Sequence, residues 1–291
     1  MSLPRFALIG FLSLALPVLA DTSTSSKDDA VVAAQPPQVS IATLGKVLQF
    51  DPLFDVLRED GIAQASELRE TLLQKAAGAD WETAVDKIYD LRPLRARFNR
   101  ALRVELAADP VLTAEILAFF ASDLGQRILS LEIDARRVFL DIATEEAARV
   151  AADTPEAARD PKWRLIARLI EAGDLIESNV AGGLSGSLAF QLGLQSTGAA
   201  GPSVPVDQLA AEIWGQEEQM RSDLSAWLKA YFGLAYSSLT EAELETYVAF
   251  LESPAGRRYS RALFIAFEAT FRPVSRDLGR LVGATMLERA I

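Results

Sequence analysis

The stretch "FLESPAGRRY", residues 250–259, predicts a sharp corner between two helices. Ser253 can accept a hydrogen bond from the backbone of a new helix, and Pro254 fits the first helical position, where no N–H is needed. Gly256 has no side chain, so another backbone can approach the new helix closely. One helix should therefore end near Leu251 and the next should begin at Pro254.

A diverged version of this stretch, "FFASDLGQRI", occupies residues 119–128 and contains Ser122 and Gly125 at the matching positions. Residues upstream of the two stretches recur in the same order: Trp81, Asp90-Leu91 and Phe98 correspond to Trp214, Asp223-Leu224 and Tyr231. The preserved order predicts two copies of one helical unit, each needing the same corner. Chance resemblance between amphipathic helices is the alternative.

Helix signals occur along most of the remaining chain. Asp51-Pro52 and Asp160-Pro161 each resemble an N-cap followed by proline, and Gly61 and Gly173 are candidate ends of those helices. The stretch 239–244, "LTEAEL", carries the residues of a capping box, and Leu112-Thr113 is the candidate helix start in the first half. Strand-like alternation is nearly absent. The fold class is therefore predicted to be all-α, with two related multi-helix units packed together.

The N-terminus resembles an export signal. Arg5 precedes an apolar run at 6–16, and Val18-Leu19-Ala20 suits a signal peptidase, so cleavage after Ala20 is expected. An uncleaved anchor is the lesser alternative, because the run is much shorter than the ~20 residues that cross a bilayer. The predicted organisation is a signal peptide at 1–20, a Ser- and Pro-rich linker at 21–40, and helical units at 41–152 and 160–291. The mature chain would be periplasmic without a transmembrane segment.

Composition excludes several classes of function. The formal net charge of −11 argues against nucleic acid, since binding needs a basic surface. The chain has neither cysteine nor histidine, which excludes disulfides, histidine-dependent triads and imidazole-ligated zinc. Carboxylates, lysine, serine and tyrosine remain for chemistry. Neither a metal site nor a cofactor is expected, and the anticipated partner is an unidentified protein or envelope component.

The stretch 239–263, "LTEAELETYVAFLESPAGRRYSRAL", resembles an exported bacterial family known as domain of unknown function twenty fifty-nine. The resemblance covers roughly 208–286 and only faintly the first half, where Asp123 replaces the proline of the corner. It implies an all-helical, exported protein and no catalytic residues.

Two features outside the corner are candidates for binding. The Gly-rich apolar insert at 182–205 is expected to form a lid or a partner-binding patch, or else a loop whose leucines cover the core. Its patch candidates are Leu188, Phe190, Leu192 and Leu194. A second candidate is an anion site at Arg272, Arg276 and Arg280, which share one helix face; a solvated face paired with acids is the alternative.

Glu252 is the candidate catalytic residue, because a single glutamate can act as both acid and base. The alternative is an acid that merely favours a helix N-terminus. The sequence therefore favours a non-enzymatic binding or envelope-assembly protein, with a carboxylate-dependent cell-envelope hydrolase or lyase as the alternative.

Overall fold

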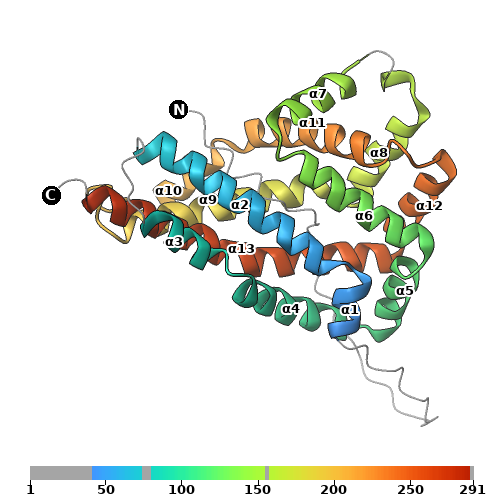
Figure 1. The fold of residues 1–291 in the computed structure, drawn as a ribbon, viewed down its shortest axis with the longest axis horizontal. Coiled ribbons are helices and arrows are strands. Elements are labelled where there is room, and N and C mark those ends of the chain that lie inside the picture. The colour runs from blue at the N-terminus through green and yellow to red at the C-terminus, as the bar shows by residue number, and fades with distance from the viewer. Residues whose placement is uncertain (1–40, 74–79, 155–156, 289–291) are drawn as a thin grey trace, which may run out of the picture.

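The computed structural model describes residues 41–73, 80–154 and 157–288, and in these residues it is helical without strands, which confirms the all-α class. The predicted signal peptide and linker lie outside the described residues. The elements in chain order (Figure 1) are α1 (Ile41–Val47), α2 (Phe50–Leu73), α3 (Asp80–Ile88), α4 (Leu91–Ala107), α5 (Pro110–Phe120), α6 (Asp123–Val138), α7 (Ile142–Ala152), the 3-10 turn η2 (Ala157–Arg159), α8 (Pro161–Ala172), α9 (Leu175–Gln195), α10 (Val206–Trp214), α11 (Glu217–Ala235), α12 (Glu241–Glu252) and α13 (Pro254–Glu288).

The long helix α13 organises the packing. It crosses the molecule from the corner with α12 to the opposite end, and α4 and α9 pack along it (Figure 1). The helix α11 packs against α6, α7, α8 and α9. Buried residues from both halves of the chain join one hydrophobic cluster, in which Phe98 of α4 contacts Phe267 of α13 with ring centroids 4.9 Å apart.

The corner predicted from "FLESPAGRRY" is present. The Ser253 hydroxyl accepts from the Gly256 N–H at 3.1 Å and donates to the Phe250 carbonyl at 2.6 Å. A side chain at Gly256 would overlap the Phe250 carbonyl, so glycine is required by the last turn of α12. The glycine predicts that another backbone approaches the new helix, and that backbone belongs to α12, the helix that directly precedes the corner.

The second corner repeats this geometry. Ser122 caps α6 with φ −71° and ψ 159°, close to −75° and 162° at Ser253, and it makes the same two hydrogen bonds at 3.1 and 2.6 Å. Gly125 lies against the Phe119 carbonyl as Gly256 lies against that of Phe250. The two corners also touch, because the rings of Phe119 and Phe250 stack with centroids 3.9 Å apart and planes 8° apart.

The correspondence does not extend clearly beyond the corners. Trp81 is buried at the start of α3, whereas Trp214 ends α10 and is 51% exposed. Asp90 caps α4, while Asp223 lies inside α11. Duplication of whole units therefore remains a prediction, and the matching geometry of the two corners is the evidence in its favour.

Several predicted helix ends are confirmed and three are wrong. One of the three is Asp51, which does not cap α2 because that helix already begins at Phe50. Asp160 and Gly173 bound α8, and Thr240 and Glu243 form the capping box of α12. Gly61, however, lies inside α2, where it provides room for the ring of Tyr89 rather than ending the helix. The helix expected from Leu112-Thr113 begins earlier, at Pro110, because Asp109 caps it through the N–H groups of Val111 and Leu112.

Candidate functional site

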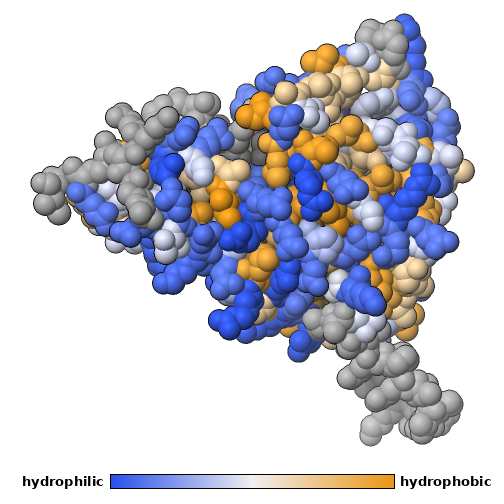
Figure 2. Space-filling view, viewed as in Figure 1, coloured by the Kyte–Doolittle hydropathy of each residue, from blue (hydrophilic) through white to orange (hydrophobic). Residues whose placement is uncertain are grey.

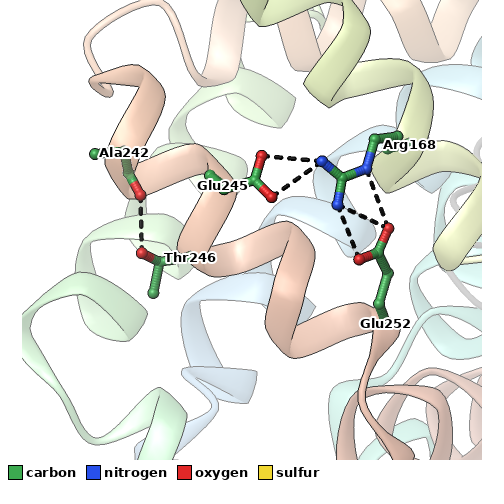
Figure 3. A network of polar contacts seen from close by, with 5 residues as sticks. All are labelled: Arg168, Ala242, Glu245, Thr246 and Glu252. Atoms are coloured by element: carbon green, nitrogen blue, oxygen red, sulfur yellow. Dashed lines mark hydrogen bonds and ion pairs between the residues drawn. The ribbon is translucent and has the colours of Figure 1, made fainter.

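Glu252 lies on the surface in a charged network with Arg168 (Figure 3). The Arg168 guanidinium of α8 binds both carboxylate oxygens of Glu252, with the shortest contact 2.9 Å, and also binds Glu245 at 3.0 Å. Both partners raise the pKa of Arg168, with Glu252 the larger cause. Glu252 thus connects α12 to α8 and faces solvent, an arrangement that provides no enclosed space for a substrate.

The three arginines of the candidate anion site lie exposed along α13. Arg272 is 3.8 Å from Glu268, and Arg280 is 3.1 Å from Asp277. Two of the three cations are therefore beside carboxylates, as the solvated-face alternative requires.

The apolar insert is not a loop over its first part, because residues 182–195 belong to α9. Its glycines serve helix packing: Gly193 lies against the Arg276 carbonyl of α13, and Gly279 of α13 lies against the Phe190 carbonyl. Leu188, Phe190 and Leu194 are half-buried against the core, and Leu192 is also half-buried. The expectation of a loop is wrong for this part, and the residues cover the core as the second alternative proposed.

A half-buried carboxylate, absent from the sequence-based candidates, lies among tyrosines of three other helices. Glu132 of α6 accepts hydrogen bonds at Oε1 from the hydroxyls of Tyr236, at 2.6 Å, and Tyr247, at 3.2 Å. The Tyr231 hydroxyl donates to the Glu132 backbone carbonyl at 2.6 Å. With Tyr259, which also feels the charge of Glu132, four of the five tyrosines in the chain surround this residue. We call Glu132 and these four residues the tyrosine cluster.

Burial dominates the electrostatics of the tyrosine cluster. It raises the pKa of Glu132 from 4.5 to about 7, against the opposing effect of the hydrogen bonds from Tyr236 and Tyr247. Burial, followed by the charge of Glu132, also raises the pKa of each of the four tyrosines. The tyrosines therefore stay neutral near pH 7, while Glu132 exchanges its proton there.

The tyrosine cluster borders a partly open cavity of about 70 Å³. Most of the wall is apolar, supplied by leucines, phenylalanines and one isoleucine of α2, α6, α8, α9, α12 and α13 and of the α1–α2 junction. The polar part of the wall consists of Glu132, Arg136, Tyr231, Tyr247, Tyr259 and Ser260. This combination of an apolar wall with a few convergent polar groups is typical of small-molecule sites.

Four polar groups at the cavity have no hydrogen-bond partner among the residues that the structure describes. Tyr259 is 7% exposed and Ser260 is 4% exposed, yet neither hydroxyl makes a hydrogen bond to them. Only Oε1 of the half-buried Glu132 is occupied by tyrosine hydroxyls, so Oε2 has no donor, and the buried Nε of Arg136 has no acceptor. Buried polar groups are normally paired, so this mixture of acceptors and a donor indicates a bound molecule or ordered water.

A wider, shallower cleft of about 490 Å³ lies on the outside of α2, α6, α7 and α11. Arg136 lines both this cleft and the cavity, and its guanidinium pairs with Asp60 of α2 at 3.2 Å. In Figure 2 hydrophobic and hydrophilic residues alternate on the surface where α2 faces α6, whereas hydrophilic residues cover much of α3 and α4. Arg136 is thus the residue that lies between the surface and the tyrosine cluster.

Within the described part of the chain, no group of acidic residues is arranged to hold a metal ion. No helix there is long and apolar enough to span a membrane.

One sequence signal could have identified Glu132. Ile128, Glu132, Ala135 and Phe139 follow each other at steps of four, three and four, which places the glutamate on an apolar helix face. A comparison with known families, curated proteins and solved structures finds no match to this chain.

Proposed function

We propose that this protein is an exported, non-enzymatic binding protein that holds a small amphipathic molecule in the cavity of the tyrosine cluster. The observation that carries the proposal is a largely apolar wall in which three oxygens, from Glu132, Tyr259 and Ser260, and the Nε donor of Arg136 have no partner in the described protein. A molecule with a polar head and a short apolar part would satisfy the oxygens and fill the space between the side chains.

The size of the cavity limits the ligand. An engineered protein cavity of about 150 Å³ accommodates benzene, so about 70 Å³ accommodates roughly three or four non-hydrogen atoms. Cell-wall fragments and acyl chains are too large for the cavity in this form.

The proposal also includes a location and a family. The envelope localisation rests on the apolar N-terminal run, and membership of domain of unknown function twenty fifty-nine rests on the resemblance at 239–263.

The proposal is tested by NMR titration of the mature protein with n-propanol and n-propylammonium. Binding in the cavity should shift the amide signals of Glu132 and Ser260 with saturation. The half-buried Ser275, which is on the same helix as Ser260 but does not line the cavity, should not respond. Linear, non-saturating shifts for both molecules would show that the cavity holds water alone.

A carboxylate-dependent enzyme is the second candidate, and Glu132 supports it better than Glu252 does. A glutamate with a pKa of about 7 is well matched to general acid–base catalysis at neutral pH. Turnover of cell-wall material by the wild type, abolished by Glu132→Gln and retained by Glu252→Gln, would establish this second function in place of the first.

A further inference from the structure

We infer that the exposed face of α4 docks the protein on a bilayer that contains anionic phospholipid. The inference goes beyond the proposed function, because no residue of α4 lines the cavity. It depends on the charge of α4, on the pairing of the acids around this helix and on the apolar residues between its arginines.

The helix α4 is basic in an acidic protein. Its 17 residues include five arginines and one glutamate, a net charge of +4, whereas the whole chain has a formal net charge of −11. Exposed residues at steps of four, four, three and four form one stripe along the helix: Arg92, Ala96, Arg100, Arg103 and Ala107. We call these five residues the arginine stripe. The buried residues of α4 lie on the opposite side of the helix.

The three arginines of the arginine stripe lack partners in the described part of the chain. The side chains of Arg92, Arg100 and Arg103 form neither a hydrogen bond nor an ion pair with the described residues. A guanidinium group stays charged near neutral pH and binds phosphate through two parallel N–H donors. Three such groups on one exposed face match the phosphates at the surface of a bilayer.

The acids that border the arginine stripe are paired with other groups. Asp51 and Asp55 of α2 bind Arg95, at 3.1 and 3.0 Å, and Glu105 of α4 is 3.8 Å from Arg261 of α13. The aspartates that cap α4 and α5 accept from backbone N–H groups. At 0.1 M salt a charge acts over about 10 Å, so these local pairings matter more to a docked surface than the net charge of the chain.

Apolar side chains beside the arginines favour a bilayer over a soluble anion. Val104 of α4 is 66% exposed, and Val111 at the start of α5 is 62% exposed. Such side chains enter the boundary between headgroups and acyl chains, while guanidinium groups remain at the level of the phosphates. The helix α4 lies along the lower edge of the fold in Figure 1, where a flat surface can approach it.

The size of the effect follows from the number of arginines. Each basic residue close to an anionic bilayer strengthens binding about fivefold, so Arg92→Gln/Arg100→Gln/Arg103→Gln should weaken it about a hundredfold. Val104→Asp should weaken binding about tenfold, because it replaces an apolar contact with a repelled charge. The triple variant should retain the circular dichroism spectrum and thermal midpoint of wild type, since its three side chains have no partners in the described protein.

The experiment is co-sedimentation of the mature protein with vesicles of phosphatidylcholine alone and of phosphatidylcholine mixed with phosphatidylglycerol. We expect wild type to bind only the mixed vesicles at about 0.1 M salt and to lose this binding at about 1 M salt, where charges act over only about 3 Å.

Two matched controls separate the α4 face from the rest of the surface. Arg272→Gln/Arg276→Gln/Arg280→Gln removes the same number of exposed arginines from α13, and Val150→Asp places the same charge at a 71% exposed valine of α7. Both controls should bind the mixed vesicles within about threefold of wild type, because charges distant from the bilayer are screened.

Three results would overturn the inference. The first is equal binding of wild type to both kinds of vesicle, or binding to neither at low salt. The second is an equal loss from the α4 and α13 triple variants, since net charge rather than the arginine stripe would then control binding. The third is binding of soluble poly-glutamate, but not of vesicles, through the three arginines, which would assign the face to an acidic protein instead of a bilayer.

Discussion

Replacing Glu132 by glutamine should stabilise the protein at alkaline pH. The folded state raises the pKa of this carboxyl from 4.5 to about 7, a shift of roughly 2.5 units. Each unit corresponds to 1.36 kcal/mol, so the ionised form costs the folded state about 3 kcal/mol relative to the unfolded chain. A glutamine oxygen can still accept from Tyr236 and Tyr247 without carrying a charge.

The sign of the pH dependence follows from which state holds the proton. Between pH 4.5 and pH 7 the folded state keeps a proton on Glu132 that the unfolded chain has already lost. The stability contributed by the protonated carboxyl is therefore complete below pH 4.5 and is lost as the pH rises through about 7. Glu132→Gln has no such proton, so its stability relative to wild type should increase by about 3 kcal/mol over this range.

The assay is urea denaturation of wild type and Glu132→Gln at pH 4.5, 6 and 8, followed by far-UV circular dichroism. The difference between the two free energies of unfolding isolates Glu132, because other titrating groups contribute equally to both proteins. Glu146→Gln, at an exposed position of α7, serves as the control and should remain parallel to wild type. Parallel curves for Glu132→Gln as well would refute the reasoning that burial controls this carboxyl.

Two further substitutions test the corner. Gly256→Ala should destabilise the protein by more than 2 kcal/mol in urea denaturation, because the new methyl group would overlap the Phe250 carbonyl. Gly186→Ala is the control: its methyl group would lie 3.4 Å from the nearest atom outside its own helix, so this substitution should be neutral or stabilising. Equal effects of the two substitutions would contradict the close approach of the backbone at Gly256. Glu252→Gln should change the free energy of unfolding by less than about 1 kcal/mol, because the side chains of Glu252 and Arg168 are both about 40% exposed in their ion pair. A larger loss of stability in thermal denaturation would mean that this ion pair stabilises the fold despite its exposure.

Local signals in the sequence were sufficient for the fold class and for the corners. Ser253, Pro254 and Gly256 act through hydrogen bonds and contacts within a few residues of each other, so their roles are readable from a short window. Gly61 was misinterpreted because its role depends on the ring of Tyr89, which lies far along the chain. Intrinsic helix propensity is a weak guide to where a helix ends when tertiary packing determines that end.

The tyrosine cluster shows the same limit for the candidate site. The apolar periodicity around Glu132 places the glutamate on a core-facing side of its helix, but its partners come from the end of α11 and from α12 and α13. Only the packing of these helices against α6 brings the hydroxyls together. The insert was misread for a related reason, since the glycines of α9 are explained by the backbone of α13 rather than by their own sequence neighbours.

The position of α13 after α4 and α9 in the chain constrains the order in which the protein can fold during synthesis. Phe98 of α4 contacts Phe267, and Gly193 of α9 lies against the Arg276 carbonyl, so both helices depend on a segment that leaves the ribosome after them. Until α13 has emerged, the apolar faces of α4 and α9 lack the surface that covers them, and the nascent chain remains open to chaperones.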